Sequence, residues 1–180
     1  FDKCENNGNI ATTKAYVVGG IIAQAKNCII KDCINRGDIT TYGYTAGIVA
    51  GLTNTDNRPC TTSITGCTNE GKVESIAKGN HTYTAGICII YNGSNGSTYA
   101  DELIINNCVN NGEIEGDTVA GIIGNSSGNL KLSDCENNGA INGRYSAGGI
   151  AQCIENKNSN EAEVSNCINN GNVFGGAEAA

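Results

Sequence analysis

The sequence lacks methionine and tryptophan, has a single proline, and contains only seven tyrosines and two phenylalanines among its 180 residues. Large apolar and aromatic side chains fill most of the core of an ordinary globular domain, so a thick conventional core is not expected. The 11 lysines and arginines nowhere cluster, which excludes the basic stripe typical of nucleic-acid partners. No apolar run reaches about 18 residues, so no membrane-spanning helix is predicted.

What the chain does have is small and polar. It carries 25 glycines, 10 cysteines and many asparagines, and its net charge of -7 is consistent with a solvated surface. Glycine and asparagine are both poor helix formers. Small residues combined with isoleucine and valine suit a thin core built from repeated flat layers. The composition therefore favours an all-β repeat protein.

One motif, Cys-x-Asn-x-Gly-x-[Ile/Val], occurs six times. Its cysteines and asparagines are Cys4 and Asn6, Cys33 and Asn35, Cys67 and Asn69, Cys108 and Asn110, Cys135 and Asn137, and Cys167 and Asn169. The same copies end at Ile10, Ile39, Val73, Ile114, Ile141 and Val173. A recurrence of this kind is the signature of a solenoid or an array.

Two further elements accompany the motif. An apolar residue lies three positions before each motif cysteine: Phe1, Ile30, Ile64, Ile105, Leu132 and Val164. A second signature, [Ala/Gly]-Gly-Ile, ends at Ile21, Ile48, Ile87, Ile122 and Ile150. Each period thus holds three short apolar segments separated by glycine and asparagine turns, which indicates strands rather than helices.

Successive motif cysteines are 29, 34, 41, 27 and 32 residues apart. Constant short motifs with variable spacing indicate fixed strands and variable corners. We therefore predict one domain over residues 1–180, a parallel β-helix of about six coils with three short strands per coil. A left-handed hexapeptide helix needs a six-residue rhythm, which is absent, so the right hand is favoured.

Within the motif, cysteine, asparagine, glycine and isoleucine share one parity, so in an extended segment they face the same way. We place Cys and Ile inside, expect the asparagines to form an internal hydrogen-bonded ladder, and expect the glycine to allow a positive φ or a close backbone approach. The competing interpretations are a binding row of asparagines and a metal or disulfide site of cysteines.

Nothing in the sequence favours a cofactor or metal. There is no Cys-x-x-Cys pair, His81 is the only histidine, and zinc needs four converging ligands, whereas a ladder spreads its sulfurs along a line. Four further cysteines, Cys28, Cys60, Cys88 and Cys153, lie outside the motif. They are even in number and could form disulfides, but sequence alone does not give a pairing.

The alternation of Gly-Gly-Ile with Cys-x-Asn-x-Gly-x-[Ile/Val] resembles the GLUG-type repeats of bacterial surface and secreted proteins, over essentially the whole chain. The family's Gly-Leu-x-Gly is here Gly-Ile-x-x, with a final glycine kept at Gly51 and Gly124. The resemblance implies a β-solenoid stalk or spacer with an extracellular or cell-surface location. It implies no catalytic residue.

Candidate binding loops are the long connections at 51–63, 88–104 and 151–163, which follow the Gly-Ile signature. Insertions on one face of a repeat protein often bind ligands, although loops also tolerate insertion at little cost. A glycan or a protein would be the partner, and the residues singled out are Asn54, Arg58, Tyr91, Asn92, Asn95, Asn156 and Asn158.

An enzyme is the alternative, because parallel β-helices can act on polysaccharides. The residue after each motif glycine forms an outward row in which Asp38 and Glu113 lie two coils apart, or about 9.6 Å. That separation is at the edge of the range for an inverting carboxylate pair. Lys72 lies between them, however, so a solvated charge row is the simpler interpretation.

Phe1 already occupies the apolar position before Cys4, so the sequence opens in mid-coil, and it ends at Ala180 without a capping segment. A solenoid must cap or pair its open edges. We expect either a segment of a longer chain with flanking domains or subunits that stack head-to-tail into a fibre. The function expected is that of a non-catalytic structural or adhesive module.

Overall fold

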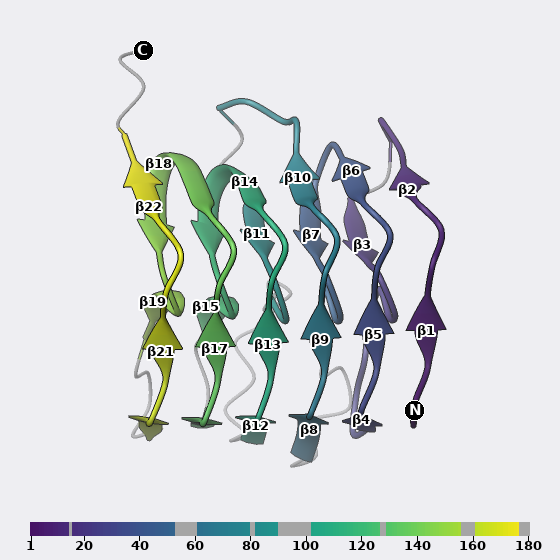
Figure 1. Cartoon of the computed structure of the whole chain (residues 1–180), viewed down its shortest axis with the longest axis vertical. Helices are drawn as coiled ribbons and strands as arrows, with labels where there is room; N and C mark the ends of the chain where they lie inside the picture. Colours follow the sequence, from purple (N-terminus) through teal and green to yellow (C-terminus); the bar gives the residue numbers. More distant parts are fainter. Residues whose placement is uncertain are drawn as a thin grey trace.

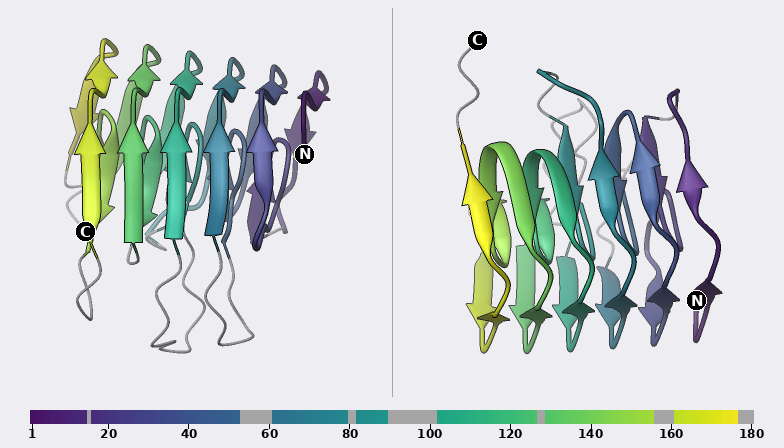
Figure 2. Two further views of the ribbon diagram at one scale, coloured as in Figure 1. Left: turned by 90° about the horizontal axis from the view of Figure 1, so that it is seen from below. Right: turned by 45° about the horizontal axis from the view of Figure 1, so that its top comes forward.

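The computed structural model describes residues 1–14, 16–52, 61–79, 82–89, 102–126, 129–155 and 161–176. Throughout these residues the regular secondary structure is β, and the paired strands run parallel with partners one coil away. Figure 1 shows corresponding strands of successive coils side by side in sequence order. The first and last coils lie at opposite ends of the stack (Figure 2). The predicted parallel β-helix is confirmed.

Four sheets run along the stack. The six-stranded sheet holds β1 (Glu5–Asn6), β5 (Ile34–Asn35), β9 (Thr68–Asn69), β13 (Val109–Asn110), β17 (Glu136–Asn137) and β21 (Ile168–Asn169). The five-stranded sheet holds β4 (Ile29–Lys31), β8 (Thr61–Thr65), β12 (Glu102–Asn106), β16 (Asn129–Ser133) and β20 (Ala162–Ser165). Its strands precede the motif cysteine in coils two to six.

The nine-stranded sheet has two arms. One arm follows the motif glycine: β2 (Ile10–Ala11), β6 (Ile39–Thr41), β10 (Val73–Ser75) and β22 (Val173–Gly175). The returning arm holds β3 (Val17–Gly19), β7 (Tyr44–Ala46) and β11 (Tyr83–Ala85), while β14 (Ile114–Ala120) and β18 (Ile141–Gly148) run continuously through both arms. A two-stranded sheet of β15 (Ile123–Ser126) and β19 (Ala151–Ile154) is continued in earlier coils by single bridges, among them Val49 to Cys88.

The strand positions differ from the predicted three per coil. The motif does not lie in one strand: in the second coil it is divided between β5, which ends at Asn35, and β6, which begins at Ile39. Gly37 lies at the bend between them. A Cβ added there would approach the carbonyl oxygen of Gly8 to well under 3.0 Å. Close packing of backbone on backbone, not a positive φ, is therefore what requires this glycine.

Positive φ values occur at another position, directly before each motif cysteine. There the chain turns from the five-stranded to the six-stranded sheet with φ between 51° and 64°, at Lys3, Asp32, Gly66, Asn107, Asp134 and Asn166. Glycine, asparagine and aspartate are the residues that tolerate this left-handed conformation best. Five of the six residues are of these types, so the corner is encoded one position before the motif cysteine.

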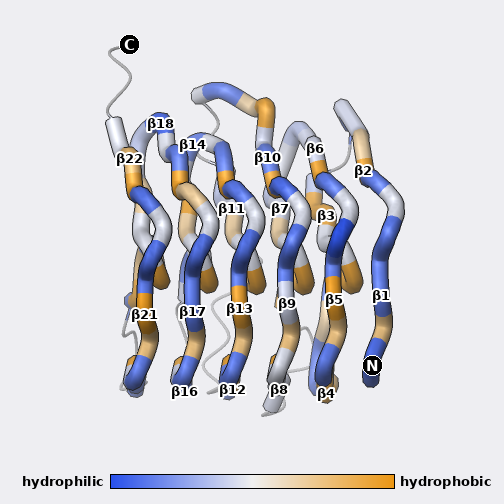
Figure 3. The backbone as a smooth tube through the Cα atoms, viewed as in Figure 1, coloured by the Kyte–Doolittle hydropathy of each residue, from blue (hydrophilic) through white to orange (hydrophobic). Residues whose placement is uncertain are grey.

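The interior follows the same repeat. The apolar residue before the cysteine, the cysteine itself and the isoleucine of the second signature pack into one large core cluster, which includes Ile30, Cys33 and Ile48. A smaller cluster between the two arms of the nine-stranded sheet contains Ile39, Val73, Ile114 and Ile141. Apolar positions recur at corresponding heights from coil to coil (Figure 3).

Candidate functional surfaces and internal ladders

The motif asparagines form a continuous ladder inside the solenoid. Each Nδ2 donates to the Oδ1 of the asparagine in the next coil at 2.7–2.8 Å, from Asn6 through Asn35, Asn69, Asn110 and Asn137 to Asn169. The second proton of each amide closes the bend onto the carbonyl of the motif glycine two residues later, at 2.9 Å from Asn35 to Gly37. These are the bonds of the internal ladder that the sequence predicts.

Burial makes this ladder structural. Asn35, Asn69, Asn110 and Asn137 are all 0% exposed. A buried amide is costly unless its donors and acceptor are satisfied, and the ladder satisfies them with the same group from the neighbouring coil. The central asparagines are therefore closed to an external ligand.

The glycine of the second signature packs against this ladder. A Cβ on Gly47 would lie well under 3.0 Å from the side chain of Asn69 and from the carbonyl oxygen of Gly86. The same contact with a ladder asparagine recurs at Gly20, Gly86, Gly121 and Gly149. The two sequence signatures thus meet across the interior, and the ladder separates the large core cluster from the smaller one.

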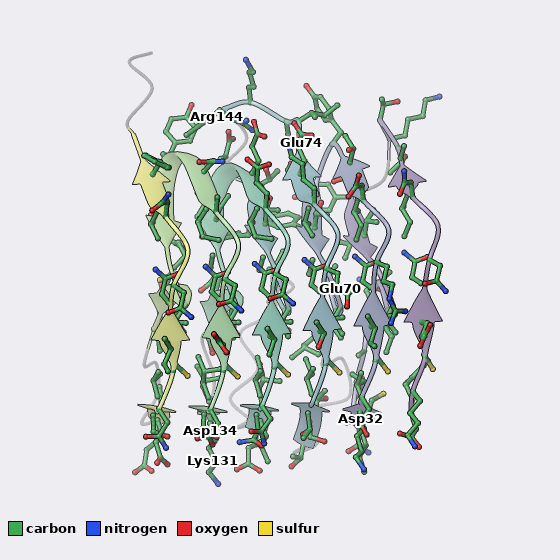
Figure 4. The ribbon with its side chains drawn as sticks, in the orientation of Figure 1. Asp32, Glu70, Glu74, Lys131, Asp134 and Arg144 are labelled. Atoms are coloured by element: carbon green, nitrogen blue, oxygen red, sulfur yellow. The ribbon has the colours of Figure 1, made fainter. Side chains whose placement is uncertain are left out.

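The motif cysteines form a second internal row. Cys33, Cys67, Cys108 and Cys135 are at most 1% exposed, whereas Cys4 and Cys167 are half-buried. Each Sγ donates to the carbonyl of the residue two positions earlier, as Cys33 does to Lys31 at 3.2 Å. Because all six thiols make this same bond, their sulfurs share one orientation (Figure 4).

The thiols of this row also interact with one another. Interaction with the neighbouring Cys108 thiol lowers the pKa of Cys67, and the pKa of Cys135 is lowered in the same way. The pKa of Cys108, which lies between these two thiols, is raised well above its usual range.

The nine described cysteines are free thiols. Cys28, Cys88 and Cys153 are among them, while Cys60 lies outside the described residues. Cys88 is buried in the large core cluster, and burial raises its pKa. In the described residues no group of three or more His, Cys, Asp or Glu side chains is arranged to hold a metal ion.

The outward row after the motif glycine is held by hydrogen bonds between coils. Asp38 accepts from the backbone nitrogen of Lys72 at 2.9 Å, and Glu113 accepts from Asn142 at 2.7 Å. Lys72 places its Nζ 2.7 Å from Glu115 and 3.9 Å from Glu113. Its hydrogen bond with Glu115 raises the pKa of Lys72. The two carboxylates of the enzyme hypothesis are thus engaged within a charge row that contains a lysine.

A second, exterior ladder was missed at the sequence level. Asn138 donates to Asn111 at 3.0 Å, and Asn170 donates to Asn138 at 2.9 Å. In earlier coils Arg36 occupies this row and contacts Glu70 at 3.2 Å. The signal was present, because the residue between the motif asparagine and glycine is itself asparagine in four of the six copies.

A buried ion pair was also missed. Arg144 Nε lies 2.7 Å from Asp117 Oδ1, and Asp117 is fully buried. Arg144 also donates through its NH2 nitrogen to the carbonyls of Ser75 and Ala77 at 2.9 and 2.6 Å, so it joins three successive coils. Figure 4 shows it at the corner opposite that of Lys131 and Asp134. The two charges are 27 residues apart, which is the local Cys108–Cys135 period.

Three tyrosines lie together on the returning arm of the nine-stranded sheet. The ring centroids of Tyr16 and Tyr44 are 5.0 Å apart, edge to face, and those of Tyr44 and Tyr83 are 6.0 Å apart and stacked. The sequence signal is the repeated Tyr-Thr-Ala-Gly-Ile at 44–48 and 83–87. Aromatic stacking between coils stabilises the arm.

The residues predicted to form binding loops are not placed by the structure. Outside the described residues lie Asn54, Arg58, Tyr91, Asn92, Asn95, Asn156 and Asn158, and also His81.

The described part of the chain contains no helix with the length and hydrophobicity that a membrane crossing requires. Comparisons with protein-family models, with curated protein sequences and with solved structures found no match.

Proposed function

We propose that this chain is a non-catalytic β-solenoid module of the extracellular space or cell surface, which acts as a rigid spacer or as a scaffold that presents its inserted corners to a glycan or protein ligand. The observation that carries the proposal is the buried asparagine ladder, which links Asn6 to Asn169 without a break. Every coil is thereby joined to the next by side-chain as well as backbone hydrogen bonds. Such a stack resists bending and extension along its axis.

Mechanical rigidity is testable by pulling on the chain. We expect single-molecule force spectroscopy, with the chain held between two reference domains, to show unfolding at a higher force than that of the Asn69→Ala variant. Asn111→Ala, in the exterior asparagine ladder, is the matched control and should unfold near the wild-type force. If wild type extends smoothly at low force, the spacer role is wrong.

The binding role depends on the loops and needs its own experiment. A glycan array and a hydrolysis assay on the same substrates distinguish a presenting scaffold from a polysaccharide-active enzyme. Binding without turnover supports the scaffold. Turnover that is lost in both Asp38→Asn and Glu113→Gln, while the fold is retained, would establish the enzyme instead.

Location and self-association complete the proposal. The resemblance to GLUG-type repeats supports a surface or secreted location, and surface biotinylation of intact cells that express the protein tests it. Exposed edges of parallel sheets can pair with another strand, so head-to-tail association of two copies is the partner interaction expected of the purified chain. Analytical ultracentrifugation that shows monomers at every concentration would contradict self-association and would leave the spacer role standing.

A further inference from the structure

The row of motif cysteines has the spacing of a linear metal–thiolate site. The strands that follow these cysteines are in register, because Ile34 pairs with Thr68 and Asn35 with Asn69 directly after Cys33 and Cys67. Neighbouring cysteines are therefore separated by one strand spacing, about 4.8 Å. Since each sulfur makes the same hydrogen bond to its own chain, the sulfurs repeat at this spacing too.

This distance does not suit a disulfide. A disulfide brings its Cβ atoms to about 3.5–4.5 Å and its sulfurs to about 2.05 Å, so two coils would have to move together locally. The motif cysteines are free thiols. By contrast, a metal–sulfur bond is about 2.3 Å long, and two such bonds in line span about 4.6 Å. That length matches the coil spacing with almost no movement.

The surroundings restrict the metal further. Zinc needs four ligands in a tetrahedron, and the described residues hold no group of three or more ligating side chains. Two neighbouring sulfurs can bind only a cation that is stable with two-coordinate geometry. Soft cations prefer sulfur ligands. A dry, apolar interior also penalises net charge, so a divalent cation, which is neutral with two thiolates, fits better than a monovalent one.

We propose that the motif cysteines form a binding row for a soft divalent cation of the mercury(II) type, held in line between the sulfurs of two neighbouring coils. The pairs are Cys4 with Cys33, Cys67 with Cys108, and Cys135 with Cys167. Each thiol loses its proton on binding, so every cation exchanges for two protons and the site becomes neutral. Cys4 and Cys167 are half-buried, which gives the first and last pairs access to solvent.

Proton loss couples binding to pH. The thiolate is the form that ligates metals. Uptake should therefore become tighter as the pH rises. This proposal is independent of the spacer role and stands or falls separately.

Native mass spectrometry with mercury(II) chloride tests the proposal on the reduced Cys28→Ala/Cys60→Ala/Cys153→Ala chain, without competing thiols, because mercury(II) also binds single accessible thiols and Cys28 and Cys153 are half-buried free thiols. We expect uptake to level off at three ions per folded chain, with two protons released per ion. X-ray absorption should show two sulfur neighbours and no oxygen or nitrogen. The thermal midpoint should rise, because a ligand that binds the folded state stabilises it. Uptake of one ion per thiol, oxygen ligands, or a lowered midpoint would overturn the site.

Variants place the ions in the row. In the Cys67→Val/Cys108→Val double variant the central pair is lost, so uptake should fall from three ions to two. Cys88→Val is the matched control, because Cys88 is equally buried but outside the row, and its uptake should stay at three. Should the double variant not fold, Cys135→Val breaks one terminal pair and should also bind two. Equal losses in the control and the row variants would contradict the proposal.

Discussion

The two bends that enclose the smaller core cluster are built in opposite ways. At the motif bend, between the six-stranded and nine-stranded sheets, every coil uses the same asparagine, and from the second coil on the motif glycine is close-packed against the preceding coil. At the far bend, between the two arms of the nine-stranded sheet, the coils differ. Coil two turns tightly with a Thr41–Thr45 hydrogen bond, coil three separates β10, which ends at Ser75, from β11, which begins at Tyr83, and β14 and β18 continue through the bend.

The difference shows that the motif bend requires strict repetition, whereas the far bend does not. A ladder needs identical groups in consecutive coils, because each asparagine must be both donor to one neighbour and acceptor from the other. One deviation would leave buried polar atoms unsatisfied on both sides. The far bend has no such requirement, so single interactions such as the Arg144–Asp117 pair can replace repetition there.

The sharpest test of the repeated bend is Gly47→Ala. The new Cβ would collide with the carbonyl oxygen of Gly86 and with Asn69, and rigid backbone cannot move aside cheaply. We expect a loss of about 4 kcal/mol in the free energy of unfolding, at the high end for one substitution. Urea denaturation followed by circular dichroism measures it.

Gly51→Ala is the control for that experiment. A Cβ at Gly51 would meet its nearest neighbours at 3.4–3.5 Å, which is ordinary contact, so we expect a change within about 0.5 kcal/mol. Similar losses in the two variants would mean that glycine is needed for chain conformation and not for contact with the ladder.

At the far bend, Arg144→Met tests whether a single ion pair stabilises the structure there. Removing the guanidinium leaves the fully buried Asp117 without its cation and takes a donor from the Ser75 and Ala77 carbonyls. We expect a loss of about 3 kcal/mol. Hydrogen exchange should become faster at residues 76–79 and stay unchanged at Asn35.

The double variant Asp117→Asn/Arg144→Met separates charge from packing. Because it removes both charges, we expect it to recover part of the loss. No recovery would show that the hydrogen bonds to the Ser75 and Ala77 carbonyls, rather than the ion pair, hold the bend.

The interior and exterior ladders can be compared at adjacent residues. Asn110→Ala removes a buried donor to Asn137 and Gly112 and an acceptor for Asn69, which should lower the free energy of unfolding by about 2–3 kcal/mol. Asn111→Ala removes one exposed bond from Asn138 and should cost under about 1 kcal/mol. Equal effects on the chemical denaturation midpoint would refute the distinction between the two ladders.

Repetition also decides what could be predicted. The asparagine ladder, the buried cysteines and the parallel stack followed from residues such as Asn69 and Cys67, because each recurs and so reveals its neighbour. The bend within the motif was not predicted, because the common parity of the motif residues suggested one extended strand. The left-handed corner at Asp32 or Asn107 was also missed, since it lies one position before the motif cysteine.

What escaped prediction occurs once. Arg144 and Asp117 carry no motif, and they lie where the register of β14 with β18 shifts, between Gly116 and Thr118. That shift gives β18 an extra residue and re-aims Arg144 toward coil three, as bulges commonly do. A period counted from the cysteines predicts the pairing of coils, but it does not predict which bends are continuous strands.

The smallest effect concerns an unrepeated pair on the solvent face, Lys131 with Glu102, whose Nζ and Oε1 are 2.7 Å apart. If the Arg144–Asp117 pair is strong because it is buried, the exposed Lys131–Glu102 pair should be weak. Glu102→Gln should then lower the free energy of unfolding by under about 0.5 kcal/mol at neutral pH. The hydrogen bond from Lys131 lowers the pKa of Glu102. The contribution is therefore present above the unfolded-state pKa and is lost as the pH falls through the folded-state pKa. Denaturation curves of wild type and variant should converge in acid; a difference that persists there would show that the pair acts through packing and not through charge.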